Sequence, residues 1–154
     1  MPDRYTFDEI PQRLGSTFVS PWITVDQRRL ELFDEATFYV RDDYEWDVDS
    51  FPDGMIEGFH LLALIPYLVS TTARLHDPNA FAMNYGLDRV RFVTPVFVGQ
   101  KLRARGEVTE IKQKNGGYLI LTEFVGEVQG HDRPGFTAAL WVLVLPRVPD
   151  DLTA

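Results

Sequence analysis

The feature that most restricts the fold is an apolar segment near the middle of the chain. From about Met55 to Leu75 the sequence predicts one long helix, whose apolar residues lie nearly all round it: Ile56, Phe59, Leu61, Leu62, Leu64, Ile65, Leu68 and Val69. A helix that is apolar on every side is buried. Pro66 lies within it and is expected to bend it, because proline interrupts the helical hydrogen-bond ladder. We therefore expect a central helix enclosed by the rest of the domain.

The sequence after Asn79 predicts strands. Between positions 101 and 109, apolar or small residues alternate with charged and polar ones, the period of a half-buried strand. Asn115-Gly116-Gly117 predicts a hairpin turn. Positions 118–128 and 136–145 predict two further strands joined by a loop at 130–135, and positions 89–93 predict a fourth strand. A long helix followed by an antiparallel meander indicates an α+β domain with its sheet curled around the helix.

Such a sheet leaves an edge strand, and pairing that edge with a second copy of the chain predicts a two-fold homodimer. No repeat, linker or low-complexity tract interrupts the sequence, so residues 1–154 are interpreted as one domain. Thr6 and Glu9 predict a capping box at a short helix. Asp26 predicts the start of a helix that runs to about Phe38, with Asp34 placed on a different face from Leu30.

Composition excludes several classes of function. The net charge of −8 argues against nucleic acid as a partner, and the absence of cysteine excludes disulfides and thiolate metal sites. Three scattered histidines make a metal site unfavourable. The longest apolar run, from Leu61 to Ser70, is too short to span a bilayer, and the N-terminus shows no apolar signal segment. We expect a cytoplasmic protein without a membrane partner.

Specific motifs carry a resemblance to a known family. Asn84 to Val96, followed by Val98 to Arg105, closely resembles the N-Y-G-x-x-R-V-R-F-x-x-P-V-x-x-G-x-x-x-R-x-R segment of bacterial MaoC-like dehydratases. Met55 to Phe59 is similar to the family's I-A-H-G-F at the start of the central helix, and Arg133-Pro134 to its usual R-P. The resemblance covers roughly positions 25–144. It implies a hot-dog fold and the (R)-specific hydration of a trans-2-enoyl thioester, or the reverse dehydration.

The resemblance also implies where the catalytic groups lie. The family signature D-x-x-x-x-H-x-D corresponds to Asp42 through Asp49. Asp42 stands for the catalytic aspartate, or Asp43 if one residue has been deleted, and Asp47 stands where the family has histidine. The second family histidine is replaced by Glu57. Both imidazoles have become carboxylates.

A carboxylate titrates near neutrality only when burial or a like charge raises its pKa. Our hypothesis is that Asp42 or Asp43 works with Asp47 or Glu57 in a modified acid–base site. The competing interpretation is a solvated acidic loop, with Glu57 stabilising the helix dipole. His60 lies one turn beyond Glu57 and could replace the lost imidazole, or it could be a core histidine bonded to a backbone carbonyl.

Substrate-binding candidates follow from the same resemblance. A backbone N–H at Gly58 would polarise the thioester carbonyl. Asn84 and Tyr85 could orient a carbonyl or a water, or serve only in strand packing. Trp46 and Phe59 could shape the pocket, or be ordinary core. Five basic residues could attract a phosphate or form a charge-paired strand face: Arg89, Arg91, Lys101, Arg103 and Arg105.

Three functions remain open. The leading one is a MaoC-like lyase, a hydratase or dehydratase with a carboxylate-based site, acting on an acyl thioester or a related small molecule. It would need no cofactor, and CoA or a carrier protein would enter only as part of the substrate. The second is an isomerase or cyclase of a biosynthetic pathway that uses the same pocket. The third is a non-catalytic ligand-binding or partner subunit.

Overall fold

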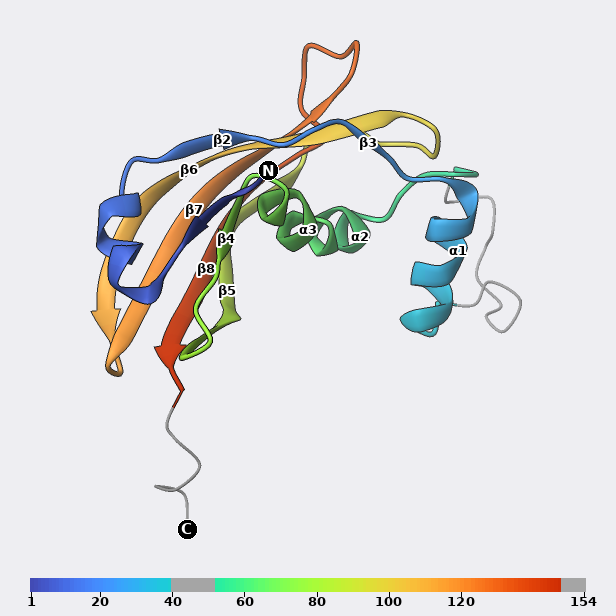
Figure 1. Ribbon diagram of the computed structural model, residues 1–154. Coiled ribbons are helices and arrows are strands. Elements are labelled where there is room, and N and C mark those ends of the chain that lie inside the picture. Colours follow the sequence, from blue (N-terminus) through green and yellow to red (C-terminus); the bar gives the residue numbers. More distant parts are fainter. Residues whose placement is uncertain (40–51, 148–154) are drawn as a thin grey trace.

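The computed structural model describes residues 1–39 and 52–147, and a six-stranded antiparallel sheet forms most of it. The strand order is β2-β6-β7-β8-β5, with β3 pairing β6 beside β2. Figure 1 shows this sheet arching over α2 and α3. The strands are β2 (Thr17–Val19), β3 (Ile23–Thr24), β5 (Ala80–Phe92), β6 (Lys101–Lys114), β7 (Gly117–Val128) and β8 (Phe136–Pro146).

The central helix is shorter than expected and consists of two pieces, α2 (Gly58–Ala63) and α3 (Ile65–Ser70). Leu64 joins them, and Pro66 occupies the first turn of α3, where a missing backbone N–H costs nothing. The predicted start at Met55 is wrong because the Ile56 N–H donates to the Val96 carbonyl, 2.7 Å away. This hydrogen bond holds the residues before α2 against the connection between β5 and β6, in a non-helical conformation.

The predicted helix end at Leu75 is also wrong. The Thr71 and Thr72 hydroxyls donate back to the Leu68 and Val69 carbonyls, and the helix ends there. The next residues form β4 (Ala73–Leu75), which pairs in parallel with β1 (Asp3–Tyr5) as a separate two-stranded sheet.

The core lies between the central helices and the concave face of the sheet. Leu61, Ile65 and Leu68 are buried against the inward-facing residues of the sheet, which include Leu102, Ala104, Phe124, Phe136 and Ala138. The prediction of a buried central helix is therefore confirmed for this face. The opposite face is open in the single chain, since Phe59 and Tyr67 are 74% and 58% exposed.

The order of the long strands differs from the predicted meander. β6, β7 and β8 are consecutive antiparallel neighbours, and the predicted turn at Asn115-Gly116 joins the first two. β5, however, pairs with β8 and not with β6, and it extends from Ala80 to Phe92, well beyond the expected 89–93. The chain therefore crosses from one side of the sheet to the other between β5 and β6, and β5 lies at an edge.

The basic residues of the strands are largely charge-paired. Arg103 donates to Glu127 at 2.7 Å and stacks over Trp22, with its guanidinium carbon 4.4 Å from the ring centroid. Arg105 also pairs with Glu127, at 3.4 Å, and Arg89 pairs with Glu123 at 2.5 Å. These pairs favour the interpretation of a charge-paired strand face for the three arginines.

Two N-terminal predictions are confirmed, the capping box and the start of the helix after Asp26. Thr6 and Glu9 form the capping box of η1 (Phe7–Arg13), and these two hydrogen bonds from Thr6 lower the pKa of Glu9. Asp26 caps α1 (Gln27–Ala36) by accepting from Arg29 N–H at 2.8 Å. None of the helices in residues 1–39 and 52–147 combines the length and the hydropathy needed to cross a bilayer.

Candidate functional site

The N-terminal end of α2 provides the framework of the candidate site. Glu57 is the N-cap residue in an extended conformation, and Gly58 is the first helical residue. A Cβ at position 58 would overlap the ring of Phe92 from β5, so only glycine allows this ring to pack on the start of the helix. The Phe59 ring meets Phe92 edge-on, with centroids 6.4 Å apart.

His60 is buried at this end of the helix, with 5% of its surface exposed. The Phe33 ring of α1 stacks on its imidazole, with centroids 4.3 Å apart and planes within 10°. Figure 1 shows α1 lying beyond the N-terminal end of α2, and the Phe33 side chain makes the contact between them. The contact between the two helices therefore encloses an ionisable group.

A second buried ionisable group, Asp34, comes from the same turn of α1 as Phe33. It is 9% exposed. Burial lowers the pKa of His60, and the negative charge of Asp34 raises it in part. The net shift is downward from the ordinary value of 6.5. His60 is therefore neutral at pH 7, the form that can accept a proton.

Asp34 was missed as a site residue in the sequence, where it was placed away from the apolar face of its helix. The signal was present, because Asp34 follows Leu30 by four residues and positions four apart share a face. Leu30 is 1% exposed, and Asp34 is buried on the same side. An acid four residues after a core leucine is thus the pattern that could have identified it.

Of the other predicted site residues, two lie at the start of α2 and four lie outside the described residues. Glu57 lies one turn before His60, and both of its carboxylate oxygens are buried. Phe59 is at the same helix end but largely exposed. Asp42, Asp43, Asp47 and Trp46 lie outside the described residues.

Asn84 and Tyr85 lie far from this end within one chain. Phe92 lies eight positions after Asn84 on β5, roughly 25 Å away at about 3.3 Å per strand residue. Tyr85 is half exposed at the sheet edge, with the Lys114 ammonium 4.9 Å from its ring centroid. The structure therefore does not gather these two residues with Gly58 and His60 in a single chain.

Asn84 instead lines a cavity of about 340 Å³ between α3, the N-terminal segment and the concave face of the sheet. Most of its wall is apolar, with contributions from Pro66, Val69, Ile120, Leu140 and Val142. Among residues 1–39 and 52–147, no three histidine or acidic side chains cluster as ligands for a metal ion.

Comparison with known proteins decides the family. The model of the MaoC like domain matches residues 47–123, which is half of the chain. The chain belongs to the MaoC-like domain family. This confirms the resemblance in the Asn84 to Arg105 segment, and the expected enzyme class, a hydro-lyase of the hydratase or dehydratase kind, fits this family.

Relatives of this MaoC-like protein cover nearly the same length. Nodulation protein N of Rhizobium leguminosarum bv. viciae is 31% identical over 150 residues, covering 93% of this chain and 92% of the relative. The 3-hydroxyacyl-thioester dehydratase Z of Mycobacterium tuberculosis is 32% identical over 128 residues, covering 77% and 82%. The solved structure of the (R)-hydratase from A. caviae superposes with a TM-score of 0.61 at 17% identity, covering 88% and 96%. The α+β hot-dog fold is thereby confirmed.

The lowered pKa of His60 predicts how the stability of the MaoC-like chain depends on pH. Below pH 6.5 this histidine is protonated to a larger extent in the unfolded chain than in the folded chain. The free energy of unfolding therefore falls as the pH decreases through this range. Urea unfolding above and below pH 6.5 should show this loss in the wild type and a smaller one in His60→Gln. An equal loss in both proteins would show that His60 does not contribute.

Proposed function

We propose that this protein is a hydro-lyase that adds water to the double bond of a 2-enoyl thioester, or removes it from a 3-hydroxyacyl thioester, at the N-terminal end of α2. The single observation that carries this proposal is the position of His60, a neutral imidazole enclosed where the central helix begins. The 3-hydroxyacyl-thioester dehydratase Z, 32% identical over 77% of the chain, supports the substrate class.

The chemistry requires a group that takes a proton from water and a group that supplies one to the α-carbon. A neutral imidazole can take the proton and give it back, since its charge changes near neutral pH. We retain the carboxylates as its partners in the proposal: Glu57 at the helix start, and Asp42, Asp43 and Asp47 from the preceding segment. No cofactor is required for this proton transfer, and CoA or a carrier protein would enter as the thiol of the substrate.

Substrate binding in the proposal uses the same helix end. The backbone N–H of Gly58 would donate to the thioester carbonyl, and the close packing of Phe92 against Gly58 fixes that part of the backbone. Phe59, and Trp46 from the preceding segment, would contact the acyl part.

The experiment is a hydration assay on trans-2-enoyl-CoA thioesters of short, medium and long chain, followed by loss of the conjugated enoyl absorbance. We expect turnover by the wild type for at least one chain length, and slower turnover by Glu57→Gln. A known (R)-hydratase is the positive control for each thioester. Absence of turnover in both directions, with CoA and carrier-protein thioesters alike, would rule the function out.

The edge strand β5 supports a homodimer in the same proposal. All but three of its thirteen residues are exposed, and they include the large apolar side chains Phe81, Met83, Tyr85, Leu87 and Phe92. Within residues 1–39 and 52–147, β5 pairs with β8 along one side, and its other side is an edge of the sheet. A long, apolar and unpaired edge strand can pair with a strand of another chain. In a two-fold dimer the β5 strand of the second copy is that partner strand.

We predict that Leu87→Lys shifts the protein from dimer to monomer in sedimentation velocity, because lysine on an edge strand opposes pairing. Leu87 is 44% exposed. The matched control is Val19→Lys on β2 at the opposite edge, where the wild-type residue is 50% exposed. A dimer that survives Leu87→Lys but not Val19→Lys would place the interface at the other edge.

A further inference from the structure

Two buried polar atoms at the contact between α1 and α2 lack hydrogen-bond partners. They are Oδ1 of Asp34 and Nδ1 of His60, and each belongs to a side chain that is more than nine-tenths buried. Buried polar atoms are bonded in the great majority of cases, because an unbonded one pays its full desolvation cost. Two such atoms on neighbouring helices indicate a place where a small polar group is bound.

The two side chains are electrostatically coupled without touching. The charge of Asp34 acts on the titration of His60. Yet no hydrogen bond or ion pair joins the two side chains, although both lie within the described residues. Their separation therefore exceeds the reach of a direct bond. Both side chains are nonetheless buried, and the Phe33 ring, from the residue that precedes Asp34 on α1, stacks on His60.

The charges of the two atoms define the group that fits between them. The Asp34 carboxylate accepts hydrogen bonds only, while the neutral imidazole of His60 accepts at one ring nitrogen and donates at the other. A hydroxyl or a water molecule can donate to Asp34 Oδ1 and bond to His60 Nδ1 at the same time. An apolar group would satisfy neither atom, and an anion would be repelled by Asp34.

We propose that Asp34 and His60 together hold one water-sized hydroxyl group, and that Asp34 is a catalytic residue of this chain. The inference rests on the proposed hydro-lyase function, in which this group is the water that reacts. The oxygen forms its bond to the β-carbon of the enoyl thioester while His60 takes one of its protons. The π electrons move toward the thioester carbonyl, and His60 then gives that proton to the α-carbon. H and OH have been added, and Asp34 stays ionised throughout.

The titratable groups that face His60 are few in the described part of the chain. Asp34 comes from α1, and Glu57 comes from the start of the helix that carries His60. Asp34 is the charge that acts on its titration. Removing the charge of Asp34 should therefore lower the pKa of His60 further, whatever reaction the protein catalyses.

The first test is an NMR titration of the His60 imidazole in the full-length protein. Asp34→Asn keeps the shape of the side chain and removes its charge, so the His60 resonances should titrate at lower pH than in the wild type. The matched control is Glu35→Gln, which removes the same charge from the next, exposed position of α1. His76→Gln and His131→Gln assign the other two histidine signals.

The second test is a crystal structure of the wild type, which should show one solvent oxygen within about 3.2 Å of both Asp34 Oδ1 and His60 Nδ1. In the thioester assay, Asp34→Asn should lower kcat on the order of 10²-fold, with KM little changed and thermal stability retained. If the shared oxygen and the shifted His60 titration are found but no thioester is turned over, the proposed function is wrong and the Asp34–His60 binding site stands. An unchanged His60 titration, or no shared oxygen, would overturn the pair itself.

Discussion

Replacing His60 by glutamine is expected to lower kcat for thioester hydration by about 10²–10⁴-fold, the contribution typical of one acid–base group. Glutamine is polar and similar in size to histidine, so it can occupy the space beside Phe33. In the wild type the Phe33 and His60 ring centroids are 4.3 Å apart. It cannot take up a proton at neutral pH. The change should therefore remove the proton transfer while leaving most of the packing.

The other two histidines provide matched controls for this substitution, since the chain has three. His76 and His131 are exposed, and neither lies on α1 or α2. His76→Gln and His131→Gln should leave kcat unchanged. The rate of the wild type should also fall on acidification, as His60 becomes protonated, and this dependence should flatten in His60→Gln. Equal rates in all three variants would exclude His60 from the chemistry.

Replacing Phe136 by alanine is expected to destabilise the fold by about 3–5 kcal/mol. Phe136 is fully buried at the start of β8, where it pairs with Phe92 on one side and Gly126 on the other. A Cβ at Gly126 would overlap its ring, so the two residues are fitted to each other. Loss of the ring leaves a cavity that the surrounding strands can fill only in part. Tm should fall on the order of 10 °C.

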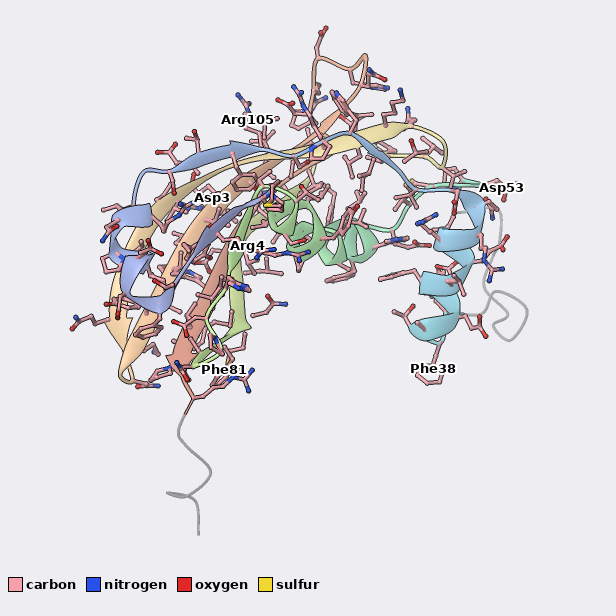
Figure 2. All side chains as sticks on the ribbon, in the orientation of Figure 1. Asp3, Arg4, Phe38, Asp53, Phe81 and Arg105 are labelled. Carbon is pink, nitrogen blue, oxygen red and sulfur yellow. The ribbon has the colours of Figure 1, made fainter. Side chains whose placement is uncertain are left out.

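Phe38→Ala is the control for this prediction, because Phe38 is 83% exposed. Figure 2 shows its side chain at the far end of α1, pointing away from the sheet. Its replacement should change the free energy of unfolding by about 0.5 kcal/mol or less. Thermal unfolding of Phe136→Ala, Phe38→Ala and the wild type measures both changes in stability. Similar losses in the two variants would contradict the assignment of Phe136 to the core.

Periodicity predicted β6 because the buried residues in its first half repeat every two positions. In β6, Leu102, Ala104 and Gly106 are buried as the alternation required. The strand order was not predictable in this way, since pairing of β5 with β8 is a long-range choice that leaves no local pattern. The break of the helix at Leu64 likewise depends on how the first turn of α3 accommodates Pro66.

The candidate site was partly predictable. His60 was identified by its spacing from Glu57, and the structure encloses it at the expected helix end. Its partner Asp34 was not, because an acid in a charged helix is usually solvated and only the tertiary contact with α2 buries it. The acidic residues Asp42, Asp43 and Asp47 stay a prediction from the family resemblance.

A double-mutant cycle in kcat tests the central claim most directly. Asp34→Asn, His60→Gln and the double variant are compared with the wild type on the best enoyl thioester. If both side chains act on one reacting water, the double variant should be about as slow as His60→Gln alone, since groups that act as a unit are not additive. Losses that multiply would show that the two residues act separately and contradict the account.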